Sequence, residues 1–166
     1  MAIYASGFSE LGNLAIDPNG NLVVTDRRAN RVIRIENDGS QTVIAGNGSF
    51  GGGGDGELAT ATGLYHVRAI WFLPTGAYFL GTDSNLSEPN GPQVWYVDLD
   101  GYIHRFLNGN FYAHAGDGAW FYDQPATPKI GAVRQVTMDY AGNLLVTENE
   151  SGYVRQVRFL PARPGP

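Results

Sequence analysis

Residues with side chains suited to catalysis stand at matching places in this chain. Glu10 and His66 each precede an apolar segment, and Arg68 and Arg134 lie near the start of the second and third such segments. Imidazole and carboxylate groups bind divalent metals such as calcium or zinc, and a bound metal lowers the pKa of its water toward neutrality. Arginines nearby would hold an anionic substrate or stabilise developing negative charge. We therefore expect these four residues to be catalytic, with Glu10 and His66 as metal ligands.

The same groups have a structural alternative. His66 and the two arginines would then hydrogen-bond loop carbonyls at the seam between neighbouring segments, which is the commoner fate of buried polar groups. His104 and His114 belong to this structural or exposed class, since neither has an acid and a nucleophile nearby in a recognisable pattern.

Aromatic residues form a second candidate set. Tyr65 precedes His66, and the loop GAWFYDQP contains Trp120, Phe121 and Tyr122. Exposed aromatic rings beside a cavity would stack on a sugar or pack on an apolar ligand. Alternatively, these rings only cover the ends of the strands.

Aspartates in the glycine-rich loops favour a structural role. Asp55 in GGGGDGE and Asp123 in WFYDQPAT occupy matching places, but the ligand spacing of an EF-hand is missing, so we expect turn caps rather than a calcium site. The other acidic residues near arginines are expected to brace loops; these pairs are Asp26 with Arg31 and Glu148 with Arg155.

An internal repeat must position these residues. The segments LAIDPNGNLVVTD from Leu14, IWFLPTGAYFLGTD from Ile70 and VTMDYAGNLLVTEN from Val136 each read as an apolar strand, a glycine-containing turn and a second apolar strand. A third strand follows in each copy, and a fourth in the first two. Unbroken apolar runs indicate sheets covered on both faces. The pattern predicts an all-β fold, a β-propeller of four-stranded antiparallel blades, three to a chain.

The blades are expected at about 11–46, 67–116 and 133–160, followed by a proline-rich tail at 161–166. The third blade has no fourth strand of its own, and residues 2–6 read as that missing strand. Propellers generally have four to eight blades, so we expect a homodimer with six, each chain completing the partner's last blade. A fragment of a longer propeller is the alternative. In blade two, Asn108–Gly109 indicates either an extra hairpin or a bulged fourth strand.

The repeats resemble those of the NHL-repeat propellers. The first copy carries the resemblance through IDPNGNLVVTDRRANRVIRI and IAGNGSFGGGGDGELATATGL. The later copies depart from the family pattern: Thr82 and Glu148 replace its strand-ending Asp, and Gln93 replaces its Arg. Six blades are common in this family, which implies the expected ring. Similar six-bladed propellers include calcium-dependent lactonases, and NHL-type repeats also serve as binding platforms.

Composition excludes several function classes. The net charge is −5, so nothing indicates a basic surface for nucleic acid, and with no cysteine there is no thiolate nucleophile. No apolar run is long enough for a membrane span and no signal peptide is evident, so we expect a soluble chain and leave its compartment open. Nucleophile-elbow, P-loop and dinucleotide motifs are missing from the sequence.

Two functions follow as predictions. The first is a metal-assisted hydrolase of small esters, lactones or phosphoesters at the mouth of the channel, with His66 as ligand or general base. The second is a non-catalytic module that binds protein or carbohydrate through its aromatic loops, which requires no coordinated acid, base and metal.

Overall fold

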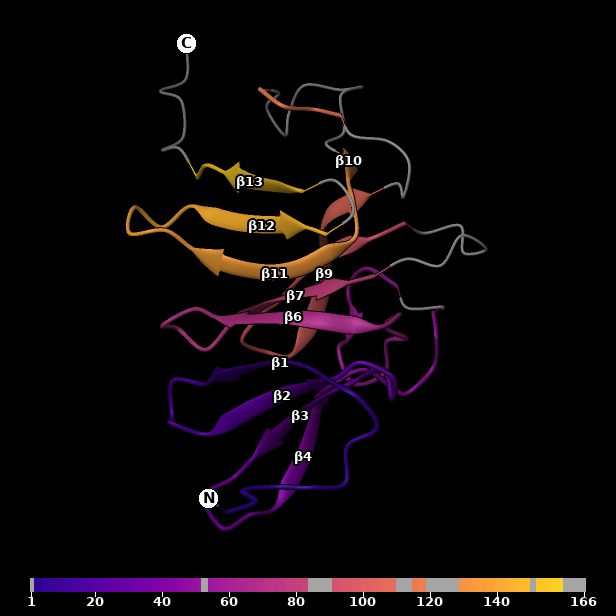
Figure 1. The fold of residues 1–166 in the computed structure, drawn as a ribbon, viewed down its shortest axis with the longest axis vertical. Coiled ribbons are helices and arrows are strands. Elements are labelled where there is room, and N and C mark those ends of the chain that lie inside the picture. The colour runs from indigo at the N-terminus through magenta and orange to yellow at the C-terminus, as the bar shows by residue number, and fades with distance from the viewer. Residues whose placement is uncertain are drawn as a thin grey trace.

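The computed structural model describes residues 2–51, 54–83, 91–109, 115–118, 129–149 and 152–159. Regular structure in these ranges consists of strands, which form three sheets that follow one another along the long axis in Figure 1. No helix in the described ranges is long and apolar enough to cross a membrane.

The first sheet is a four-stranded antiparallel meander. Its strands are β1 (Leu11–Ile16), β2 (Leu22–Asp26), β3 (Arg31–Ile35) and β4 (Gln41–Ala45). The β1–β2 turn is closed by Asp17, whose Oδ1 accepts the backbone N–H groups of Asn19 and Asn21 at 2.9 and 2.8 Å. Gly20 completes this turn with φ 87°, a left-handed conformation that favours glycine.

The second sheet has four meander strands and two short strands on its outer edge. They are β6 (Val67–Phe72), β7 (Tyr78–Thr82), β8 (Gln93–Val97) and β9 (Tyr102–Gly109), with β5 (Glu57–Leu58) and β10 (Lys129–Ile130). Both short strands pair with β9, β5 antiparallel and β10 parallel.

The fourth strand of this blade is bulged. Asn108 and Gly109 lie inside β9, where Asn108 is opposite Gln93 and Gly109 is paired with β10. They are therefore not the centre of a hairpin turn. The register between β8 and β9 shifts between Val94 and Trp95, which confirms the bulged alternative.

The third sheet contains β11 (Val133–Met138), β12 (Leu144–Glu148) and β13 (Tyr153–Val157). These strands are antiparallel. β1 lies against β6, and β6 lies against β11, so the first strands of the sheets are neighbours (Figure 1). The expected fold class, an all-β propeller of antiparallel blades with three blades in this chain, is confirmed.

Two apolar layers join the sheets. The layer between the first and second sheets includes Val23, Val32, Leu64, Ile70 and Leu80. The layer between the second and third sheets includes Phe79, Val94, Val133, Val136 and Leu144. Because the second sheet packs on both faces, every residue of β7 is buried, which explains the unbroken apolar run in the sequence.

The two ends of the stack are less covered. Leu14 and Ile16 of β1 are 63% and 58% exposed, while Ala15 between them packs on the first apolar layer. Residues 2–8 form no strand in this chain. They lie near β4 in Figure 1, where Gln41 Nε2 donates to the carbonyl of Ser6 at 3.1 Å. Pairing of residues 2–6 with β13 of a second chain stays a prediction.

Candidate functional site

Carboxylates at strand ends hold the chain as it enters a new sheet. Asp26, the last residue of β2, accepts the backbone N–H groups of Ser9 at 2.8 Å and Glu10 at 3.0 Å. Arg27 N donates to the carbonyl of Glu10 at 2.8 Å. These bonds fix Glu10 beside Arg27 at the end where β1, β6 and β11 begin, which we call the mouth end.

The third sheet repeats this device. Glu148 ends β12 opposite Val133, as Asp26 ends β2 opposite Leu11. Its Oε2 accepts the N–H of Gly131 at 2.7 Å. In the second sheet this register position is occupied by Thr82, and the carboxylate of the next residue, Asp83, contacts the side chains of Arg68 and Arg27.

His66 is placed by an unusual backbone. Among the described non-glycine residues, positive φ is found at His66 (44°) and Asn30 (53°). The two are joined directly, because Oδ1 of the buried Asn30 accepts the His66 N–H at 2.9 Å. Left-handed residues of this kind are held only where the surrounding structure determines them, and they concentrate at functional sites.

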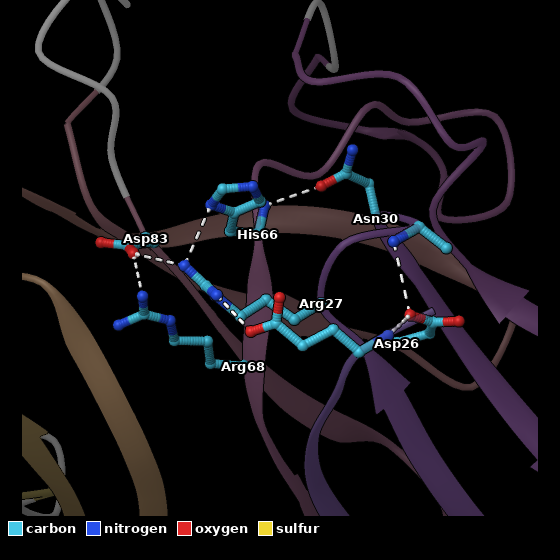
Figure 2. A network of polar contacts seen from close by, with 8 residues as sticks. Asp26, Arg27, Asn30, His66, Arg68 and Asp83 are labelled. Atoms are coloured by element: carbon cyan, nitrogen blue, oxygen red, sulfur yellow. Dashed lines mark hydrogen bonds and ion pairs between the residues drawn. The ribbon is translucent and has the colours of Figure 1, made fainter. Parts of the chain in front are cut away.

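Arg27 is the centre of a polar network at the mouth end (Figure 2). Its Nη1 contacts Glu10 Oε1, and its Nη2 lies 3.4 Å from His66 Nδ1 and 3.9 Å from Asp83 Oδ2. Arg68 Nη2 contacts the same Asp83 oxygen at 2.5 Å. We call Glu10, Arg27, His66, Arg68 and Asp83 the Arg27 network.

The network is electrostatically balanced, with two guanidinium and two carboxylate groups. A hydrogen bond from Arg27 lowers the pKa of Glu10. Burial lowers the pKa of His66, and the positive charge of Arg27 lowers it further, so the imidazole is neutral at pH 7. A guanidinium group only donates, so the contact with Arg27 requires His66 Nδ1 to accept, which places the imidazole proton on Nε2.

An aromatic cluster adjoins the network. The ring centroids of Tyr65 and His66 are 4.2 Å apart, and Phe50 lies 5.8 Å from Tyr65 and 6.1 Å from His66. Phe50 is 57% exposed. We call Phe50, Tyr65 and His66 the aromatic rim; it presents apolar ring surface directly beside charged groups.

The structure brings together several predicted site residues and separates others. Glu10, His66 and Arg68 share the Arg27 network, and Tyr65 contacts His66. Arg134 is exposed at the bulge of β11 and forms no ion pair with another residue in the described ranges. The predicted aromatic residues Trp120, Phe121 and Tyr122 lie outside the described residues.

Sequence reasoning missed four contributors to the site, which are Arg27, Asn30, Phe50 and Asp83. Arg27 and Asp83 had a usable signal, because each directly follows the last residue of a second strand. Their shared position predicts that both side chains lie at the mouth end. Phe50 and Asn30 had no comparable signal.

The predicted metal ligands are separated by a cation. Arg27 contacts both Glu10 and His66, so a divalent metal between them would have to displace its guanidinium group. Within the described part of the chain, no three His, Cys, Asp or Glu side chains gather as a metal site. As arranged, the residues do not fit a metal, and a metal on His66 and Glu10 remains a prediction that requires Arg27 to move.

The other residues singled out in the sequence mostly make structural contacts. Asp55 Oδ1 accepts the N–H of Arg105 at 2.7 Å, a cap between loop and strand. Glu148 and Arg155 form the expected pair at 3.5 Å, whereas Asp26 braces backbone N–H groups rather than Arg31. His104 Nε2 contacts Asp98 Oδ2 at 2.9 Å. Asp123 and His114 fall outside the described ranges.

No protein-family model and no curated protein matches the sequence. Solved structures do resemble it. A protein of unknown function from Bacteroides thetaiotaomicron VPI-5482 has a TM-score of 0.69 at 17% identity, covering 92% of this chain and 37% of that one. An auxiliary nutrient binding protein from the same organism has a TM-score of 0.58 at 12% identity, covering 86% and 36%.

A gluconolactonase from Xanthomonas campestris has a TM-score of 0.55 at 14% identity, covering 89% of this chain and 59% of that one. This chain therefore spans less than two thirds of the length of each of these proteins. At such low identities the likeness concerns the fold alone. The comparisons therefore support a conclusion about architecture: the chain has a β-propeller fold.

Proposed function

We propose that the mouth end of the first two blades binds a small polar ring compound of the carbohydrate class. The observation that carries the proposal is the contact between the aromatic rim and the Arg27 network through His66. Apolar ring faces and a few oriented polar groups are what a sugar site needs, because a sugar has apolar C–H faces and a hydroxyl-lined edge.

The backbone supports a ligand site over a purely structural network. His66 holds a left-handed conformation that is costly for a non-glycine residue, whereas Asn30 ends the turn between β2 and β3, where asparagine adopts this conformation readily. The side chain of Arg27 is 25% exposed, so part of it is accessible from solvent.

The proposal includes the NHL-type assignment of the repeats. In this reading the loops between second and third strands form a binding platform, as NHL-type repeats frequently do, and the first of these loops supplies Arg27 and Asn30. One structural neighbour is an auxiliary nutrient binding protein, which is compatible with such a role.

Calorimetric titration with a panel of methyl glycosides tests the binding proposal. Tyr65→Ala and Phe50→Ala should weaken binding at least about tenfold, because each removes a stacking surface. Tyr140→Ala is the matched control, since this residue is fully exposed on the β11–β12 hairpin. Equal loss in all three variants, or no binding by any glycoside, would contradict the proposal.

A second candidate function is hydrolysis of an ester or lactone at the same place. The observation that favours it is the neutral imidazole of His66, with its Nε2 proton available beside two arginines. Water would add to the acyl carbon, the bond from that carbon to the ring oxygen would break, and the proton lost by water would end on the leaving alkoxide. His66 would donate to the acyl oxygen, with Arg27 and Arg68 stabilising its charge.

Hydrolysis of a panel of lactones, measured with and without a chelator, distinguishes a metal-assisted mechanism from one that uses the neutral imidazole as donor. Activity lost in His66→Ala and abolished by the chelator supports metal assistance by His66 and Glu10. Activity lost in His66→Ala but indifferent to the chelator supports the neutral donor. Unchanged hydrolysis in His66→Ala eliminates catalysis at this site.

A further inference from the structure

The two carboxylates of the Arg27 network are held very differently. Asp83 has a side chain only 11% exposed and lies 2.5 Å from Arg68, with a second approach to Arg27 at 3.9 Å. Glu10 is 48% exposed, and Arg27 is the one residue of the described chain that its carboxylate contacts. One carboxylate is therefore fixed in the network, and the other is attached to its solvent side.

Another carboxylate can replace Glu10 on Arg27 at little cost in stability. Exposed ion pairs contribute little to stability, because solvent screens them and two long side chains must be ordered. Releasing Glu10 leaves its carboxylate in water, so no buried charge is stranded. Arg27 stays in place through His66 and Asp83.

We propose that the ligand carries a carboxylate that replaces Glu10 on Arg27, so that the natural ligand class is the acidic sugars, such as uronates. This inference rests on the proposed binding function and adds the charge of the ligand. Exchange of one carboxylate for another leaves the network balanced. A neutral sugar would leave Glu10 where it is, and a metal cation would meet the guanidinium group of Arg27.

The aromatic rim offers a stacking surface for a ring. Its three rings lie in contact, with centroids 4.2 to 6.1 Å apart. A pyranose stacked on the rim would place a ring substituent near Arg27, because His66 belongs to both clusters. This geometry favours a monosaccharide acid over an acidic peptide, whose carboxylates lie on flexible chains.

Methyl β-D-glucuronide and methyl β-D-glucoside are the matched probes, since they differ only in the carboxylate. Calorimetry on the whole chain should show the glucuronide binding at least about tenfold more tightly, with the preference shrinking as salt is raised. Glu10→Ala removes the internal competitor and should tighten glucuronide binding by about two- to fivefold.

Variants at Arg27 and at a surface ion pair elsewhere in the chain serve as controls. Glu36→Ala breaks the surface pair with Arg34 and should change neither affinity. Arg27→Gln should abolish the preference for the glucuronide. If that variant does not fold, the effects of Arg27→Lys and Glu10→Ala on glucuronide binding test the same inference. Equal affinities for both glycosides overturn this inference and leave the binding proposal intact. Binding of neither glycoside, or of an acidic peptide instead, overturns both.

Discussion

The left-handed backbone of His66 gives a prediction that can be worked out in energy. An L-residue with a side chain pays roughly 1–2 kcal/mol for this conformation, whereas glycine does not. Glycine costs about 0.5–1 kcal/mol more backbone entropy than alanine on folding. His66→Gly and His66→Ala lose the same imidazole contacts, so the glycine variant should be the more stable of the two by about 0.75 kcal/mol, the difference between the midpoints of these ranges.

Urea unfolding, followed by tryptophan fluorescence, measures the difference between the two variants. Thr137 provides the control, because it lies in β11 without a positive φ. There the order should reverse, with Thr137→Gly less stable than Thr137→Ala. If His66→Ala equals or exceeds His66→Gly in unfolding free energy while Thr137 behaves as expected, the backbone of His66 is not strained and this support for a ligand site is lost.

Three further predictions follow from the fold. The depressed pKa of His66 means that the unfolded chain takes up the proton first as pH falls below about 6.5; the unfolding midpoint should therefore drop between pH 7 and pH 5, and His66→Asn should flatten that part of the profile. The buried Ile70 fills the layer between the first two sheets, so Ile70→Ala should cost about 2–5 kcal/mol in urea unfolding, and a loss below 1 kcal/mol would contradict the packing. The exposed Leu14 and Ile16 are predicted to face a second chain; light scattering should give the mass of two chains, the double change to Asp should give one, and a monomeric unaltered chain would refute the dimer.

The strands could be predicted because their signals are local. Alternating or unbroken apolar residues and the turn glycines Gly20, Gly76 and Gly142 fix each hairpin, and all three glycines have positive φ, at 87°, 104° and 80°. The same local reasoning gave an ambiguous result at Asn108–Gly109. That dipeptide often forms a turn, but pairing with Gln93 and β10 keeps it extended, and such tertiary pairing overrides propensity.

The site was only partly predictable because it depends on contacts between blades. Matching positions in the repeat placed Glu10 and His66 at one end of the sheets, as found. The place of Arg27 directly after β2 indicates the same end of the sheets, but its contacts with both Glu10 and His66 had no signal in the sequence, since they depend on the hydrogen bonds of Asp26 to the incoming chain. Likewise, no local rule assigns a left-handed backbone to His66, which Asn30 holds from another blade.

The most direct test of a ligand site at the mouth end is an NMR titration. Uniformly ¹⁵N-labelled chain would be titrated with methyl β-D-glucuronide, and the amide signals followed residue by residue. We expect the largest shifts at Arg27, Asn30, His66 and Asp83, with little change at Tyr140 at the opposite end of the sheets. Shifts confined to other residues, or none at saturating ligand, would contradict the assignment of the Arg27 network as a binding site.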